Sequence, residues 1–384
     1  MIAKELGSKS YFFRRKEPIR RWKFHSVVDR RPDRRLMQIN GSLQHINKKE
    51  ERISLLKYIV RRLLLMIPVI LGVAFLVFAL CRLAPGDPVK SLLGVNATAE
   101  KEAEVRAELG LDKGFFTQFY LYVKGIVTKL DFGTSYSDKR PVSDQLLSRF
   151  PISVKLGLMS MGLAVIFGIP FGIISAVKQY SALDYGVTII SMFFASMPGF
   201  WLALMLMIIF ALNLGWFPAS GMSSWKSWIL PAMASGLGPI ASISRTTRSS
   251  MLEVIRQDYI RTARAKGVPE GKIVTRHALK NALIPVVTVV GLQLGSAMGG
   301  SMIVENIFTL PGCGTLLLNA INTRNYPVIQ GCVLLISVTI SLASLIVDIL
   351  YAFIDPRIKA QYSSKKKDRK TEAASTDEAP AATA

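Results

Sequence analysis

The chain has 384 residues, half of them hydrophobic, yet its formal net charge is +22. In a soluble protein so large a positive charge would indicate nucleic-acid binding. Here the basic residues are separated from long uncharged stretches, which is typical of a membrane protein and argues against a nucleic-acid partner. The few cysteines and histidines are scattered, so the sequence predicts no metal site, no cofactor and no catalytic residues of its own.

The N-terminal 52 residues form a basic extension that precedes the first long apolar run. Residues 1–62 carry eighteen Lys and Arg against six Asp and Glu. Such a segment can contact anionic lipid headgroups, or it can be a solvated and poorly ordered cytoplasmic tail, which is the interpretation we favour. The sequence assigns it no further role. Residues 359–384 are of low complexity and predict a disordered cytoplasmic tail.

Between these ends, residues 53–358 contain six runs that approach the roughly 20 apolar residues a membrane helix needs. These runs cover 63–81, 156–177, 186–212, 228–244, 281–304 and 325–347. The fourth is diluted by Gly, Pro and Ser. The expected fold class is all-α, a polytopic membrane protein with six transmembrane helices. Both termini and the connection 245–281 then share one side, and because all three are basic we place that side in the cytoplasm.

The connection 84–150 falls on the external side and is long enough for a small folded lobe. Its stretch 102–109 reads as a helix, and 115–127 is aromatic and apolar enough to lie on the membrane surface. In the third run, Pro198 breaks the helical pattern, either as a bending point for gating or as static shaping of the bundle.

The fifth run carries Gly291, Gly295 and Gly299 at four-residue spacing. Small residues in such a stripe let another helix approach closely, so we predict helix packing there. The approaching helix could belong to this chain or to another one.

The connection 245–281 has more order than a basic loop requires. It is helix-forming up to Lys266, and Gly267 followed by Pro269 predicts a helix stop before a restart near Glu270. The apolar face of the first helix is expected at four-residue steps, on Ile255, Tyr259 and Ala263. The pattern predicts a helix, a glycine turn and a second helix that project into the cytoplasm.

This connection resembles the "EAA" cytoplasmic loop of bacterial ATP-binding-cassette (ABC) import permeases. Ala263, Ala265 and Gly267 match the first part of that motif, and the Leu-Ile-Pro that ends at Pro285 matches the second. Arg-Thr-Ala replaces the leading Glu-Ala-Ala at 261–263, which resembles the oligopeptide/dipeptide/nickel branch. Six further segments support this branch: RLAPGDP (82–88), LGLD (109–112), DFGTS (131–135), ENIFTLPG (305–312), NYP (325–327) and DPR (355–357).

The resemblance implies a type I ABC importer permease fold in the bacterial cytoplasmic membrane. It also implies four protein partners: a second homologous permease subunit, two ATP-binding cassette ATPase subunits and an extracytoplasmic substrate-binding protein. Membrane lipids would surround the permease. No G-x-x-x-x-G-K-[ST] phosphate loop occurs in the sequence, so ATP is expected to be hydrolysed by the partners. The residues implied in ATPase coupling are Tyr259, Arg261, Ala263, Arg264, Ala265, Gly267 and Pro285.

The resemblance implies di- or oligopeptides as cargo, with nickel or another small solute as the alternative. Two other classes of membrane protein are alternatives to an importer permease. A secondary carrier driven by an ion gradient would place ionisable groups inside its spans, and the interiors of these runs are free of charge. A membrane receptor or scaffold would have no associated ATPase. The importer permease is the function we expect.

Overall fold

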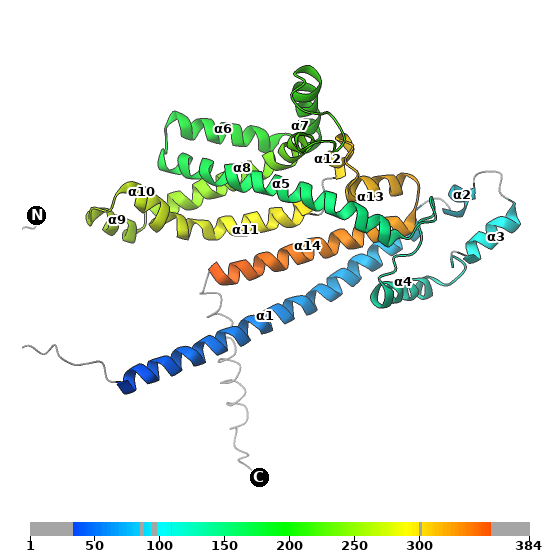
Figure 1. The fold of residues 1–384 in the computed structure, drawn as a ribbon, viewed down its shortest axis with the longest axis horizontal. Helices are drawn as coiled ribbons and strands as arrows, with labels where there is room; N and C mark the ends of the chain where they lie inside the picture. Colours follow the sequence, from blue (N-terminus) through cyan, green and yellow to red (C-terminus); the bar gives the residue numbers. More distant parts are fainter. Residues whose placement is uncertain (1–33, 85–87, 94–97, 109, 299–301, 355–384) are drawn as a thin grey trace, which may run out of the picture. The chain divides into compact units, whose positions relative to one another are not determined.

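The computed structural model describes residues 34–84, 88–93, 98–108, 110–298 and 302–354 (Figure 1). Throughout these ranges the regular structure is helical, and the one β contact is an isolated bridge between Thr134 and Pro141. The all-α prediction is therefore confirmed. The chain has two units, Met1–Ile53 and Ser54–Ala384, and every contact described below lies within the second.

The α-helices are α1 Arg34–Leu83, α2 Pro88–Leu93, α3 Ala99–Glu108, α4 Phe115–Lys129, α5 Val142–Val177, α6 Ala182–Ser196, α7 Gly199–Leu206, α8 Ile229–Ile255, α9 Asp258–Ala265, α10 Glu270–Lys272, α11 Leu279–Met298, α12 Met302–Ile307, α13 Cys313–Asn322 and α14 Tyr326–Ile354. Short π-helical or 3₁₀ segments adjoin them at η1 Met207–Asn213, η2 Trp225–Trp228 and η3 Ile273–Ala278. The helices predicted at 102–109 and 115–127 correspond to α3 and α4.

Among the described residues, four helical stretches are long and apolar enough to cross a membrane: Ile59–Leu83, Val142–Val177, Glu270–Met298 and Tyr326–Leu350. A fifth span results if α6 is joined to the helix Gly199–Asn213, although the two are bent by 106°. The count of six is not confirmed. The run predicted as the fourth span lies in α8, which is long enough but too polar to meet the same apolar criterion.

The prediction of one helix over 186–212 was wrong. The chain leaves the helix at Met197 and Pro198, whose ψ angles of 136° and 131° are extended. A proline disfavours helical geometry in the residue before it and cannot donate a backbone hydrogen bond. Pro198 therefore ends α6, and α7 begins in a new direction at Gly199.

Part of the N-terminal extension is helical, and the division of the chain into units falls after Ile53. A poorly ordered segment was expected over 1–52, but α1 begins at Arg34. No proline interrupts the chain from there to the apolar run, and Leu, Gln, Lys and Glu are frequent, all of them good helix formers. Residues 1–33 and the predicted tail 359–384 lie outside the described residues.

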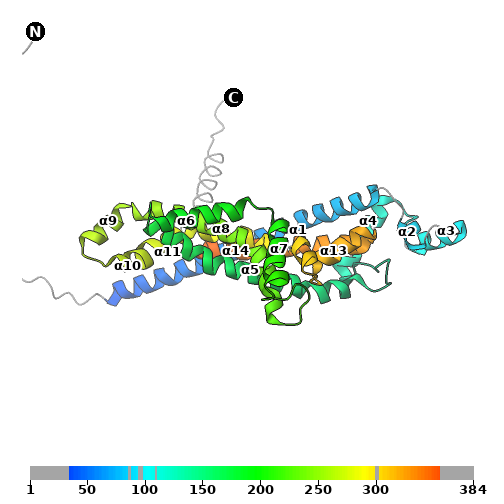
Figure 2. The ribbon, with the colours of Figure 1, turned by 90° about the horizontal axis from the view of Figure 1, so that it is seen from above.

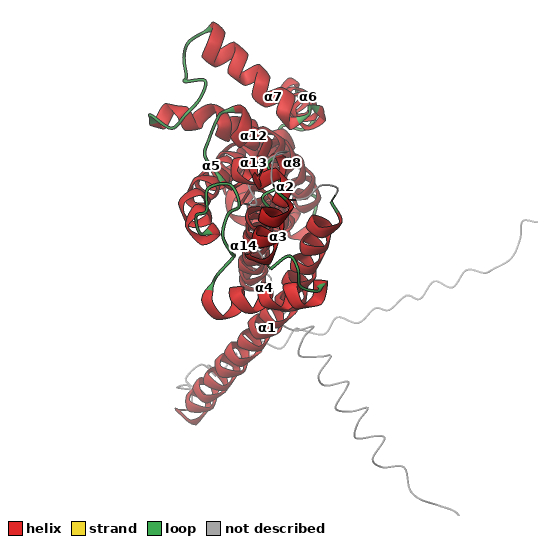
Figure 3. Ribbon diagram, turned by 90° about the vertical axis from the view of Figure 1, so that its right-hand side faces the viewer, coloured by secondary structure: helices red, strands yellow, loops and turns green. Residues whose placement is uncertain are grey.

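Helix α5 packs along both α8 and α11, so that the three run side by side (Figure 1). Figure 3 shows the described chain as helices joined by loops. Small residues of α5 make this possible. A Cβ added at Gly172 would collide with the Thr247 side chain and lie 2.5 Å from the Ser244 carbonyl oxygen. At Gly157 an added Cβ would lie 2.7 Å from the carbonyl oxygen of Ala297 in α11. The backbones of these helices are therefore in near contact.

The glycine stripe of α11 faces α14 of the same chain. A Cβ at Gly291 would collide with the side chain of Val347, and one at Gly295 would lie 3.7 Å from Ile340 and Ser344. The position of Gly299 lies outside the described residues. At its first two positions the stripe thus brings together the last two candidate spans, which run antiparallel.

The close α5–α8 contact predicts the effect of a single methyl group. Gly172→Ala places that methyl against the Ser244 backbone, which cannot move aside like a side chain, so we expect a loss of about 1–3 kcal/mol. Gly162→Ala, in the same helix, is the matched control, because nothing lies within 4 Å of an added Cβ there. It should be neutral or stabilise by up to about 1 kcal/mol. Unfolding midpoints in detergent measure both; equal midpoints would contradict the packing.

Candidate functional site

The connection from α8 to α11 folds into a turn built from α9, α10 and η3, at one end of these two helices (Figure 2). The expected stop at Gly267 and restart at Glu270 are present. The expectation of an unbroken helix up to Lys266 was wrong, because α8 ends at Ile255. Gln257 then adopts an extended conformation with ψ 150° and is the N-cap of α9, which begins at Asp258.

That break changes which side chains face the core. Ile260 is fully buried, whereas Tyr259, expected on the apolar face, is 45% exposed. Interrupting the helix at Arg256 and Gln257 shifts the register of everything that follows, so a prediction that assumed continuous helical periodicity selected the wrong residue. Ile255 and Ala263, the other two residues of the predicted face, are half-buried against the core.

An apolar cluster fixes the turn to three long helices. Ile260 of α9 and Ile273 of η3 pack with Met251 of α8, Ala176 of α5 and Ala282 of α11. Burying one isoleucine side chain fully contributes about 1.5–3 kcal/mol. The turn is therefore anchored to all three helices.

The shape of the turn depends on Gly267. Its φ of +75° lies in the left-handed region, where a residue without Cβ has no steric cost. Two backbone hydrogen bonds close the end of α9, from Gly267 N–H to the Arg264 carbonyl (2.9 Å) and from Val268 N–H to the Ala263 carbonyl (3.2 Å). This is the glycine C-cap that the sequence predicted.

An ion pair crosses the same turn. The Arg264 guanidinium donates to both carboxylate oxygens of Glu270, at 2.6 and 3.1 Å. The two side chains are 41% and 54% exposed, so water screens the pair and its contribution is at most about 1 kcal/mol. Its bidentate geometry nevertheless holds the Arg264 side chain against α10.

Most of the predicted coupling residues lie on the outer surface of the turn. Tyr259, Arg264, Ala265 and Gly267 are exposed, and the Arg261 side chain is 74% exposed. The Tyr259 hydroxyl accepts a hydrogen bond from Asn281 Nδ2 at 2.8 Å. Two predicted residues are placed differently: Ala263 is half-buried, and Pro285 lies within α11 after the turn.

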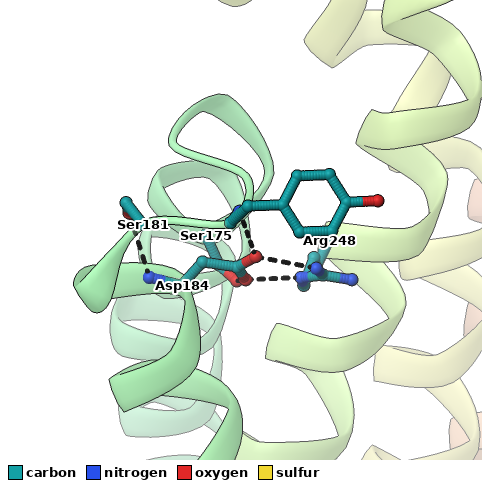
Figure 4. Close-up of polar contacts among 5 residues, drawn as sticks. Ser175, Ser181, Asp184 and Arg248 are labelled. Carbon is teal, nitrogen blue, oxygen red and sulfur yellow. Dashed lines mark hydrogen bonds and ion pairs between the residues drawn. The ribbon is translucent and has the colours of Figure 1, made fainter.

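A buried ion pair lies beside this apolar cluster (Figure 4). Asp184, at the start of α6, is 2% exposed and accepts from Arg248 Nε at 2.7 Å and from Arg248 Nη2 at 2.8 Å. The Ser175 hydroxyl donates to it at 2.5 Å, and the Tyr180 N–H at 3.0 Å. Ser175 precedes Ala176 of the apolar cluster in α5. The ion pair thus joins α5, α6 and α8 next to the turn.

Sequence reasoning missed this pair. Its local signal was present, because Ser181 caps α6 by accepting from the Asp184 N–H at 3.3 Å, and Ser-x-x-Asp is a helix-start pattern. No local signal connects Asp184 to Arg248, which is 64 residues away.

A second buried carboxylate was also missed, although its residue stands in one of the quoted motifs. Glu305 of α12 is completely buried and accepts from the Ser153 hydroxyl of α5 at 2.6 Å. It also accepts from the N–H groups of Gly314 and Thr315, at 2.8 and 3.2 Å. Burial raises the pKa of Glu305, while these donors favour its charged form. The network ties α5 to the start of α13, far from the turn along the chain.

Comparison with known proteins identifies the family. Residues 168–360 match the family described as binding-protein-dependent transport system inner membrane component, and residues 55–157 match its N-terminal region. The chain belongs to this family. It is therefore an ABC importer permease and a multi-pass inner-membrane protein, which excludes the ion-driven carrier and the scaffold.

Curated relatives of this permease are named after peptide substrates. It is 43% identical to the dipeptide transport system permease protein DppB of Alkalihalophilus pseudofirmus, over 79% of this chain and 100% of that one. It is 45% identical to the glutathione transport system permease protein GsiC of Salmonella choleraesuis, over 79% of this chain and 99% of that one. Among solved structures, the inward-facing MetNI methionine ABC transporter aligns with 18% identity and a TM-score of 0.46, over 55% of this chain and 96% of that chain.

Proposed function

We propose that this permease forms half of the translocation path for di- or oligopeptides. The names of the relatives support this cargo, because one is a dipeptide permease and another a glutathione permease. The other half of the path would come from a second, homologous permease subunit. A substrate-binding protein would deliver the peptide at the end of the helices remote from the α9–α10 turn. The charge pattern of the sequence supports an external position for that end.

We further propose that the α9–α10 turn receives the movement of a separate ATPase subunit. The observation that carries this proposal is the combination of an exposed outer surface with an anchored inner one. Tyr259, Arg261 and Ala265 face outward, while Ile260 and Ile273 bind the turn to α5, α8 and α11. Coupling between two proteins requires such a rigid contact and two discrete states. Arginine suits the contact, since its donors have a fixed geometry.

Site-directed cross-linking tests the contact. The native Cys81, Cys313 and Cys332 are all buried, so an exposed introduced cysteine is the accessible thiol. Ala265→Cys should be cross-linked to the co-expressed ATPase subunit by a short thiol-reactive reagent. Lys129→Cys, equally on the surface but in α4, is the control and should capture none. Failure of Ala265→Cys to capture the ATPase would contradict the docking role.

A further inference from the structure

One face of α4 packs on the candidate span of α1 through aromatic rings. Phe115 lies edge to face with Phe75 and Phe78, with ring centroids 5.9 and 5.2 Å apart. Phe119, one turn further along α4, meets the same two rings at 5.3 and 5.4 Å. Aromatic pairs in this geometry attract each other beyond the area that they bury. Helix α4 is therefore fixed to α1 through this face.

A second face of α4, which we call the outer face, carries large apolar side chains that this chain leaves uncovered. They are Phe116, 76% exposed, Tyr120, 62% exposed, and Val127, 76% exposed. Their spacing places all three within about 40° of one another around the helix. The adjoining face carries the exposed Lys124 and Thr128, with Leu121 between them. Such a division of apolar and polar residues is typical of helices that lie at a membrane surface.

Tyr120 and Lys124 mark the border between the outer face and the polar face. The Lys124 Nζ lies 5.9 Å from the centroid of the Tyr120 ring. Tyrosine has an apolar body with a polar tip, and lysine has an apolar stem with a charged end, so both residues suit the boundary between an apolar phase and water. That boundary would then run along the length of α4.

The contact with α1 sets the depth of α4 in the membrane. The candidate span Ile59–Leu83 has 25 residues. At 1.5 Å for each residue it is about 37 Å long, a few Å more than the roughly 30 Å of hydrocarbon. Phe75 lies about 12 Å before the end of the span at Leu83. Phe75 is therefore inside the hydrocarbon near its boundary, and the α4 rings that touch it are at the same level.

The direction of α4 agrees with this depth. The candidate spans run roughly horizontally in Figure 1, and Figure 3 looks along that direction. In Figure 3, α4 lies across the picture. The helix therefore follows the boundary instead of crossing it.

The outer face is continuous with apolar surface on α1. The Phe116 ring is 5.4 Å from that of Phe115, which in turn contacts Phe75. Phe75 is itself 43% exposed, and Leu76 and Leu80 beside it in the span are both 57% exposed. A span in a bilayer presents such residues to acyl chains, because water is absent there. The same phase is thus within reach of α4.

We propose that α4 lies in the interface of the lipid bilayer. Its outer face inserts among the acyl chains, and Lys124 extends to the level of the headgroups. The partner of this surface is therefore the membrane lipid itself and not another protein. The proposal rests on the membrane location of the family and does not depend on the peptide cargo.

Spin labels on single introduced cysteines test this proposal in vesicles of phosphatidylethanolamine and phosphatidylglycerol that contain the full-length chain. The native cysteines are all buried, so the introduced thiol takes the label. The measurement is the ratio of label collisions with oxygen, which concentrates among acyl chains, to collisions with a water-soluble nickel chelate. Lys101→Cys, exposed on the polar helix α3, gives the value for water, and Leu76→Cys in the α1 span gives the value for acyl chains.

Val127→Cys should give a ratio at least about tenfold above that of Lys101→Cys and close to that of Leu76→Cys, since an outer face in lipid is shielded from water. Thr128→Cys is the matched control, because it is the next residue but points from the polar face, and its ratio should be clearly lower. A ratio at Val127→Cys equal to that of Lys101→Cys would show that water covers the outer face. A label shielded from both oxygen and the chelate would show that a protein covers it. Either result would overturn the proposal.

Discussion

Replacing Gly267 by arginine is expected to abolish peptide uptake while leaving the protein in the membrane. A Cβ added at Gly267 would meet no atom within 4 Å, so the arginine side chain has room to project from the exposed turn toward the proposed ATPase. The φ of +75° also imposes about 1–2 kcal/mol of local strain on a residue with a Cβ. Because the apolar cluster beneath is untouched, the fold should persist. Uptake of a radiolabelled dipeptide in cells that lack their own copy measures the effect.

Gly267→Asn is the matched control for the backbone. Asparagine tolerates the left-handed region better than other side chains and is much smaller than arginine. Uptake should therefore remain at about half or more of the natural level, with equal amounts of each variant in isolated membranes. Normal uptake by Gly267→Arg would argue against docking at this turn.

Asp184→Asn is expected to cause a large loss of stability, about 3 kcal/mol. Removing one partner of a buried ion pair leaves the other charge without compensation, which typically costs about 3–5 kcal/mol. We expect the lower end, because the Arg248 side chain is 29% exposed and keeps some water. Denaturant midpoints of unfolding in detergent measure the change, with the denaturant dependence of the free energy of unfolding held fixed between variants.

The chain supplies its own control for this prediction. Arg264 and Glu270 form an ion pair of the same bidentate geometry on the surface, so Glu270→Gln should cost at most about 1 kcal/mol. Combining Asp184→Leu with Arg248→Met should recover most of the stability, since an apolar pair can replace a buried ionic one. If Asp184→Asn is no less stable than Glu270→Gln, the buried pair has no structural role.

Movement at the turn would reach helix α6 through the buried ion pair rather than through the apolar cluster. Helix α6 has no residue in the apolar cluster, but Asp184 joins it to α5 and α8. If the coupling proposal holds, the bent pair α6 and α7 would follow the turn through this ion pair.

Features that depend on neighbouring residues were predictable from the sequence. Gly267 followed by Pro269 indicated the end of α9, because a left-handed glycine and a proline act on their own backbone. The apolar runs of α5, α11 and α14 indicated spans, since the bilayer responds to composition and length. The motifs resembling importer permeases indicated the family, which the comparisons confirmed.

Only the tertiary structure decided which residues meet. Nothing in the sequence near Gln257 signals a break in the helix. The break nevertheless places Ile260 instead of Tyr259 in the core, where Ile260 packs with Met251 and Ile273. The partners Asp184 and Arg248 are 64 residues apart, and Ser153 and Glu305 are 152 apart. A backbone preference is local and can be read along the chain. A buried charge is stabilised by whichever partner the path of the chain brings to it.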